Sequence, residues 1–161
     1  MLNSTISGNT GGTGIDNSNG ATLKLINSTV TGNKGYYDQQ YYTCGNHGEG
    51  ASGVENLGGA ATVRNSIIAD SHANALCNNS LSDVRGQFTS EGHNLIGDAG
   101  PEGWALGFDA EGDQVGGGAA AVLDPELLPL ADNGGPTFTQ APAPGSPAID
   151  AGSSDEATDQ R

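Results

Sequence analysis

The feature that most constrains the fold of this chain is a short repeat that returns after 24 residues. Residues 2–9, LNSTISGN, align with residues 26–33, INSTVTGN, and most positions are identical or conservatively replaced. A weaker third copy, residues 65–71, starts 38 residues after its counterpart in the second, and an insertion accounts for the extra length. A repeat of this length is typical of solenoid proteins, in which each unit buries its apolar side only by stacking on the next.

A second pattern runs alongside the first. The segment GIDN at residues 14–17 returns as GVEN at residues 53–56, and each copy precedes a stretch with high β-propensity, residues 21–25 and 60–63. Each repeat therefore holds about three short strands separated by Gly and Asn corners. The sequence lacks the leucine ladder of leucine-rich repeats and the six-residue period of hexapeptide solenoids. We therefore predict an all-β fold, a right-handed parallel β-helix of roughly four coils.

Stacked coils place equivalent residues above one another at the spacing of neighbouring strands, ~4.8 Å. The alignment predicts one inward row from Ile6, Val30 and Ile68, and a second from Leu23 and Val63. It also predicts an amide ladder in which Asn9 lies over Asn33. Asn-x-Ser/Thr triplets begin at Asn3, Asn27 and Asn78, and we interpret the first two as part of the repeat rather than as glycosylation signals.

We expect coils over residues 1–98, interrupted by an insertion at 34–52 that holds all four tyrosines. Loops that interrupt a solenoid project from one face and often carry function. Tyrosines beside Asp and Gln can stack on sugars and form hydrogen bonds with them. The alternative is that the tyrosines only pack the insertion against the solenoid. The candidate ligand-binding residues are Tyr36, Tyr37, Asp38, Tyr41 and Tyr42.

Residues 99–161 differ in character, with a glycine-rich stretch followed by six of the seven prolines between positions 125 and 147. Proline lacks an N–H donor and suits an extended strap better than interior strands. We expect this strap to close the same domain, to run back along its own solenoid and to bury Ile149.

The tail contains the blocks NLIG (94–97), DPEL (124–127), LADNGGPT (130–137), PGSPAIDAG (144–152) and TDQR (158–161). Together with the NSTISGN repeat, these blocks resemble the choice-of-anchor Q domain of bacterial surface proteins, which follows β-helix repeats of the pectate-lyase-like and polymorphic-outer-membrane-protein type. The resemblance covers nearly the whole chain. It implies an exported protein, extracellular or at the cell surface, and it offers no established catalytic residues.

The charge of the chain restricts its partners. A net charge of −14 repels phosphate, so nucleic acid and anionic membrane surfaces are poor partners. No segment has the length and apolar character of a membrane span, and the first residues lack the features of a signal peptide. We therefore expect a fragment of a longer exported protein, without membrane insertion.

Acidic residues alternate at Asp109, Glu111 and Asp113, as in calcium-binding loops, although the full EF-hand pattern is absent. Calcium is thus a candidate ligand, and a solvated acidic loop is the alternative; no cofactor is required. Cys44 and Cys77 could form a disulfide, remain free thiols, or bind zinc with His47 and His72.

The function predicted from these features is a structural and binding module that contacts glycans or other surfaces. A fragment of a polysaccharide lyase or hydrolase is the first alternative, for which Arg64, Asp70, His72 and Asp83 are the available groups. A self-assembling filament subunit is the second alternative, because the first coil has an unprotected edge through which copies of the chain could pair.

Overall fold

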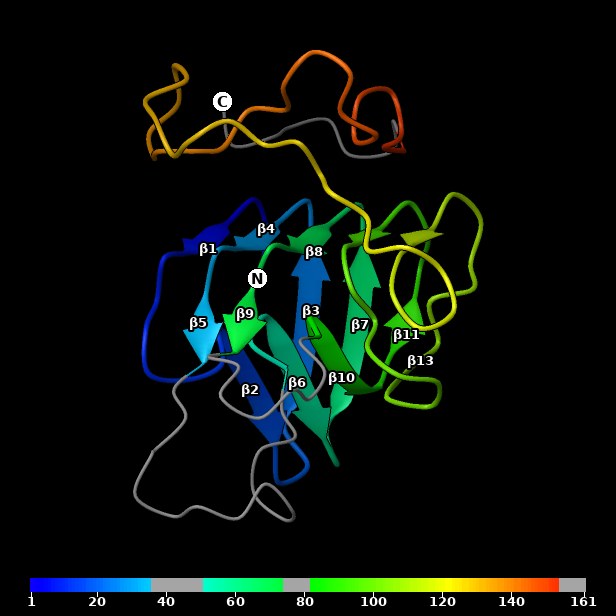
Figure 1. Cartoon of the computed structure of the whole chain (residues 1–161). Coiled ribbons are helices and arrows are strands. Elements are labelled where there is room, and N and C mark those ends of the chain that lie inside the picture. Colours follow the sequence, from blue (N-terminus) through cyan, green and yellow to red (C-terminus); the bar gives the residue numbers. More distant parts are fainter. Residues whose placement is uncertain (36–50, 74–81, 154–161) are drawn as a thin grey trace.

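The computed structural model describes residues 1–35, 51–73 and 82–153, and every regular element in these ranges is a β-strand (Figure 1). All strand pairs within the sheets are parallel. The predictions of an all-β chain and of parallel sheets are therefore confirmed.

Three sheets surround the interior, and the chain visits them in turn (Figure 1). The first sheet has the order β1 (Thr5–Ser7), β4 (Thr29–Thr31), β8 (Ile67–Ala69), β12 (Leu95–Ile96) and β14 (Gln114–Val115). The second has the order β2 (Ile15–Ser18), β6 (Val54–Leu57), β10 (Val84–Gln87) and β13 (Ala105–Leu106). The third contains β3 (Thr22–Ile26), β7 (Ala60–Arg64) and β11 (Thr89–Ser90). A small fourth sheet pairs β5 (Lys34–Gly35) with β9 (His72–Ala73).

The register of the first sheet follows the repeat. Ile6 pairs with Val30, and Val30 pairs with Ile68, as the alignment predicts. Ile96 continues the same row, so residues 94–97 act as a further copy of the repeat. The sheets also extend beyond residue 98, because β13 and β14 add one strand each.

The predicted pairing of Leu23 with Val63 is wrong by two residues. Leu23 pairs with Ala61, and Val63 pairs with Leu25. The two copies are offset by 39 residues at β2 and β6 (Ile15 with Val54) and by 38 at β3 and β7 (Thr22 with Ala60), because the corner between these strands differs in length by one residue. A slip of two residues keeps the same side chains inward, so hydrophobic alternation alone did not exclude it.

The corners before β1, β4 and β8 explain the repeated asparagine. Asn3, Asn27 and Asn65 all have φ near +48°. Asparagine enters this left-handed region more readily than other residues with a side chain. The repeated asparagine thus specifies a corner of the backbone, in agreement with our interpretation of the first two Asn-x-Ser/Thr triplets. The third, at Asn78, lies outside the described residues.

The core is a single apolar cluster to which all three main sheets contribute. Val30, Ile68 and Ile96 come from the first sheet, while Val54 and Val84 come from the second. The third sheet and the corner that precedes it supply the rest of the buried row, namely Leu23, Leu25, Ala61, Val63 and Phe88. At the C-terminal side the Phe88 ring lies 4.9 Å from that of Phe108, centroid to centroid. Because the strands are short, each pass can bury its side chains only against its neighbours.

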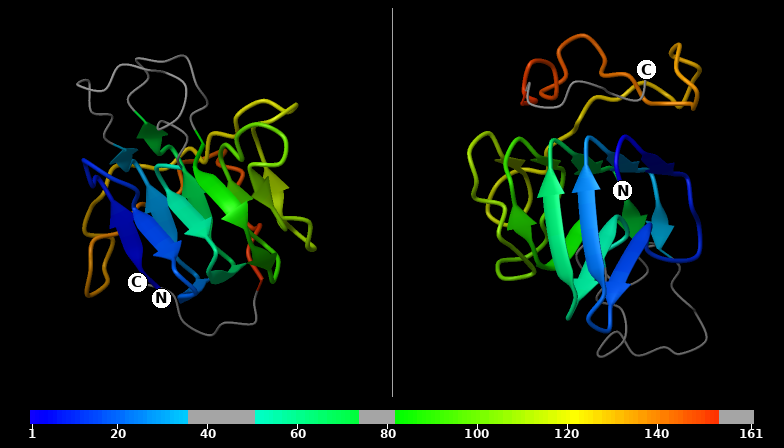
Figure 2. Two further views of the ribbon diagram at one scale, coloured as in Figure 1. Left: turned by 90° about the horizontal axis from the view of Figure 1, so that it is seen from below. Right: turned by 180° about the vertical axis from the view of Figure 1, so that it is seen from behind.

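The strap, residues 123–153, lies over the outer side of the first sheet (Figures 1 and 2). Within it, residues 126–131 run antiparallel to residues 139–143. The strap contacts the stacked strands at Thr31, Gln114, His93 and Asn65, so it runs back along them as expected. The predicted burial of Ile149 is wrong, because this side chain stays 47% exposed. Leu128, Leu130 and Phe138 of the strap are exposed as well, whereas Pro125 is fully buried.

Candidate functional site

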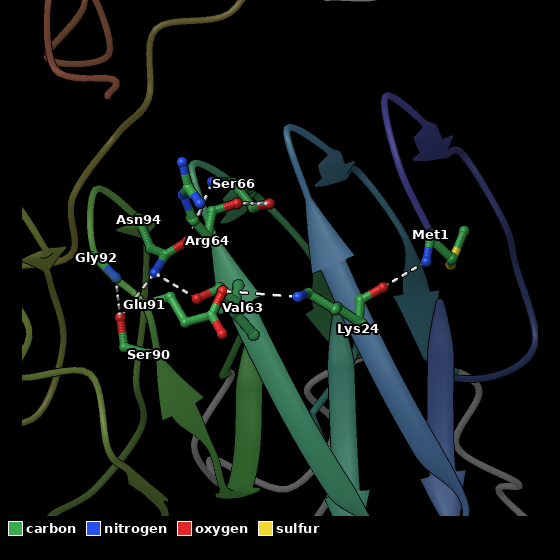
Figure 3. Close-up of polar contacts among 9 residues, drawn as sticks. All are labelled: Met1, Lys24, Val63, Arg64, Ser66, Ser90, Glu91, Gly92 and Asn94. Carbon is green, nitrogen blue, oxygen red and sulfur yellow. Dashed lines mark hydrogen bonds and ion pairs between the residues drawn. The ribbon is translucent and has the colours of Figure 1, made fainter. Parts of the chain in front are cut away.

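Polar ladders fix the corners between sheets, and they determine which polar residues are available for other roles. One ladder crosses five passes of the chain. The backbone N–H of each member donates to the side chain of the next, in the order Ser4, Ser28, Ser66, Asn94 and Asp113, at 2.9–3.2 Å. Figure 3 shows part of it: Asn94 between Ser66, Ser90 and the Val63 carbonyl.

Asp113 closes this ladder at its last pass. Its Oδ1 accepts hydrogen bonds from the backbone N–H and the side-chain amide of Asn94, at 2.9 and 3.0 Å. Its Oδ2 accepts from the N–H of Ala110 at 3.1 Å. Asp113 is half-buried, whereas Asp109 and Glu111 are exposed. Among residues 1–35, 51–73 and 82–153, no group of three or more His, Cys, Asp or Glu side chains is placed to hold a metal. Calcium binding by Asp109, Glu111 and Asp113 stays a prediction.

A second ladder starts with the predicted Asn9–Asn33 pair, which is confirmed by a 2.9 Å amide–amide hydrogen bond. The N–H of Asn33 donates to Ser71, and the N–H of Ser71 donates to Asp83. Asp83, considered above for hydrolase chemistry, is therefore a buried ladder member. Burial raises the pKa of Asp83 to about 7, against the lowering effect of hydrogen bonds from the backbone of Ser71 and Asp98.

The outer face of the second sheet carries a row of chemically diverse side chains. Asp16 on β2 pairs in register with Glu55 on β6, and Glu55 pairs with Arg85 on β10. Trp104 directly precedes β13, whose Ala105 pairs with Gly86, so Trp104 extends the row by one strand. We call Asp16, Glu55, Arg85 and Trp104 the outer-face row. Alternation along a strand turns these four residues to one side, away from the buried Val54 and Val84.

Three members of the outer-face row, Glu55, Arg85 and Trp104, contact one another. Arg85 Nη1 lies 3.2 Å from Glu55 Oε1, and the guanidinium carbon lies 5.4 Å from the centre of the Trp104 ring. These are the distances of an ion pair and of a cation–π contact. The Glu55 side chain is 14% exposed and that of Arg85 is 28% exposed. Burial raises the pKa of Glu55, Arg85 lowers it, and the Asp16 carboxylate raises it further.

Apolar side chains border the row. Leu57 and Leu106 stand two residues further along β6 and β13, on the same face, and are 47% and 49% exposed. Gln87 pairs with Leu106, and Ser18 pairs with Leu57. The face thus combines hydrogen-bond donors, acceptors, an indole and aliphatic groups, which together can bind a ligand with one polar and one apolar side.

The outer-face row was missed in the sequence, although its signal was present. The aligned segments GIDN and GVEN already place Asp16 over Glu55, and a third copy, SDVRG at residues 82–86, places Arg85 next. Of the groups weighed for catalysis, Arg64 ends β7, Asp70 follows β8 and His72 begins β9. They belong to different sheets from the outer-face row.

The predicted tyrosine site, Tyr36, Tyr37, Asp38, Tyr41 and Tyr42, lies outside the described residues, as do Cys44, Cys77 and His47. The residues that flank the two segments are described. Gly35, before the first segment, pairs with Ala73, before the second. Ser52, after the first, donates its N–H to the carbonyl of Ser82, after the second, at 3.1 Å. Both segments therefore leave and rejoin the stacked strands at neighbouring positions.

No helix in the described part of the chain is long and apolar enough to cross a membrane. Comparisons with protein-family models, with curated proteins and with solved structures found no match to this chain.

Proposed function

We propose that this chain is a right-handed parallel β-helix module of an exported bacterial surface protein, and that it binds glycans on the outer face of its second sheet. The handedness is supported by a general rule: connections between parallel strands of one sheet are right-handed in about 98% of cases. The exported, extracellular or cell-surface location is supported by the resemblance of the tail blocks to the choice-of-anchor Q domain.

The observation that carries the binding proposal is the outer-face row. A sugar presents C–H groups on the face of its ring and hydroxyl groups at its edge. Trp104 offers a surface for the first, and Arg85 and Glu55 offer a donor and an acceptor for the second. The Arg85–Glu55 pair and the Arg85–Trp104 contact hold these groups in place before a ligand arrives, which reduces the entropic cost of binding.

The tyrosine-bearing insertion extends this proposal. It rejoins the strands before Ser52, three residues ahead of Glu55, and the second segment rejoins before Ser82, three residues ahead of Arg85. The ends of both segments are therefore fixed beside the strands that carry the row. We propose that Tyr36, Tyr37, Asp38, Tyr41 and Tyr42 contribute to the same glycan contact.

A glycan array tests the proposal. We expect the labelled chain to bind a defined set of glycans, and Trp104→Ala to weaken this binding at least tenfold. The matched control is Phe138→Ala, which removes a 61% exposed aromatic side chain from the strap. Circular dichroism checks that both variants fold. Equal loss of binding in the two variants, or no binding by the parent chain to any glycan, would contradict the proposal.

Glycoside hydrolysis is a second candidate function, favoured by one observation. Asp16 and Glu55 are two carboxylates on neighbouring strands and the same face, and burial raises the pKa of Glu55, as is usual for a general acid. The release of reducing ends from any glycan bound on the array tests it. Turnover that is lost in Glu55→Gln while binding remains would establish the enzyme; binding without turnover would favour the module.

A further inference from the structure

The charges of the outer-face row do not balance. The row contains two carboxylates, Asp16 and Glu55, and one guanidinium, that of Arg85. Arg85 lies against Glu55 at 3.2 Å and over Trp104, so its charge is already engaged by neighbouring groups. Asp16 is exposed, and within residues 1–35, 51–73 and 82–153 its carboxylate has no hydrogen-bond or ion-pair partner. One carboxylate of the row is thus available to a ligand.

The surroundings of Asp16 strengthen the preference of this site for cationic over anionic ligands. The whole chain carries a net charge of −14, so the field at its surface repels anions and attracts cations. An acidic sugar would have to place its carboxylate beside Asp16 and Glu55, and Arg85 is already paired with Glu55. Repulsion between like charges at a binding surface weakens the binding of partners that carry the same charge as the surface. An anionic polysaccharide is therefore disfavoured here.

The geometry of the face favours a sugar chain over a simple cation. Trp104 and the exposed Leu57 and Leu106 provide an apolar strip beside the charged row. Neighbouring strands are ~4.8 Å apart, which is similar to the length of one sugar residue in a polysaccharide. A glycan that crosses the strands could thus place one residue near Trp104 and another near Asp16. Neither the apolar strip nor this spacing has a role in binding an isolated metal ion.

From these observations we infer that the outer-face row selects glycans with free amino groups: the ammonium of an amino sugar pairs with Asp16, and a ring further along the same glycan chain, three strand spacings away, packs on Trp104. This inference rests on the proposed glycan-binding function and specifies its ligand class. Asp16 then determines specificity, whereas Trp104 supplies affinity for any glycan bound here. N-acetylation removes the positive charge of the sugar and should therefore weaken binding.

Binding of glucosamine hexamers and N-acetylglucosamine hexamers, measured by calorimetry at pH 6, tests this inference. We expect the parent chain to bind the free amine at least tenfold more tightly than the acetylated form. Asp16→Asn should reduce this preference to less than threefold, while Trp104→Ala should weaken both ligands and leave the preference. Asp132→Asn on the strap is the control for a change of one charge unit, and it should behave like the parent chain.

The outcomes separate the inference from the proposed function. Equal binding of the two hexamers, or a preference that survives in Asp16→Asn, would overturn the selection of amino sugars while leaving glycan binding intact. Binding of neither hexamer, together with binding of other glycans on the array that depends on Trp104, would overturn it as well. A hexalysine peptide that binds as tightly as the glucosamine hexamer, without dependence on Trp104, would show that the row attracts any polycation.

Discussion

Asp83 shows how a single buried carboxyl group joins two passes of the chain. It is 2% exposed, and its two oxygens accept the N–H groups of Ser71 and Asp98 at 2.7 and 2.8 Å. Loss of hydration disfavours the charged form more than these donors favour it, which raises its pKa to about 7. Asp70 and Asp98 add to the effect, because a further negative charge near them is unfavourable.

This raised pKa predicts that the chain becomes less stable as the pH rises from about 4 to about 7. The unfolded carboxyl titrates near 4, so within this window the folded state binds a proton that the unfolded state has lost. The contribution of Asp83 is complete below pH 4 and is lost above pH 7, with a slope of at most about 1.4 kcal/mol per pH unit. Urea unfolding of the parent chain and of Asp83→Asn at pH 4.5, 6 and 8 measures it. The stability advantage of the parent should shrink with pH; a constant or growing advantage would contradict the pKa shift.

Asp113 has a structural role that a calcium experiment must take into account. Asp113→Ala removes the acceptor for the N–H and amide of Asn94 and for the N–H of Ala110. We expect a loss of about 1–3 kcal/mol in the free energy of unfolding without calcium, because these donors are partly buried. Asp109→Ala, at an exposed position, should change stability by less than about 0.5 kcal/mol. Equal effects in urea unfolding would show that Asp113 does not support the ladder.

Calcium binding is therefore better tested at Asp109 than at Asp113. Extracellular sites bind calcium at about 10⁻⁴–10⁻³ M, so millimolar calcium should raise the melting temperature of the parent chain if the acidic loop binds it. Asp109→Asn should abolish the rise without disturbing the ladder. Thermal unfolding in EDTA and in 5 mM magnesium provides the control, because an equal rise with magnesium would reflect charge screening rather than calcium binding. The absence of any rise with calcium would remove the prediction.

At the scale of strands and corners, buried ladder residues should contribute more to stability than exposed ones, and a buried pair of asparagines allows the comparison. Asn56 accepts the amide of Asn17 at 2.7 Å and donates to the carbonyls of Gly59 and Gln87. Asn56→Ala should cost about 2–3 kcal/mol, because it leaves several buried polar groups without partners. Asn9→Ala, at the exposed end of another ladder, should cost about 0.5 kcal/mol. Urea unfolding of both variants compares them, and a smaller effect at Asn56 than at Asn9 would refute this ranking.

The strands that could be predicted from sequence are those whose local signal repeats. Ile6, Val30 and Ile68 each stand three residues after the Asn of an Asn-Ser pair, so several positions specified the register together. The stretch around Leu23, residues 21–25, shares only Ala and Thr with residues 60–64, and the corner before it changed length, so its partner was mistaken. The outer-face row depends on a third copy, around Arg85, that shares little with the first two beyond the apolar residue before Arg85. It also depends on Trp104, whose place follows only from the pairing of β13.

At the scale of the whole molecule, the stacked sheets end in strands with one unpaired edge. In the described part of the chain β1, β2 and β3 are edge strands on one side, and β14, β13 and β11 are edge strands on the other. Because all pairs are parallel, a second copy stacked head to tail would continue every sheet in the same direction. Such a contact uses two different surfaces, and it forms filaments when the rotation between copies does not close.

The net charge of −14 opposes this stacking, which makes the association of the isolated chain dependent on salt. We expect light scattering at high micromolar concentration to show monomers at low ionic strength and larger species as salt is raised, because screening shortens the reach of the repulsion. Ser7→Lys on β1 should reduce association, because a long charged side chain on an edge strand discourages pairing. Asp132→Lys on the strap gives a larger change of charge at a site away from that edge, so it should not reduce association. A chain that stays monomeric at every salt concentration would mean that electrostatic repulsion is not what keeps these edges apart.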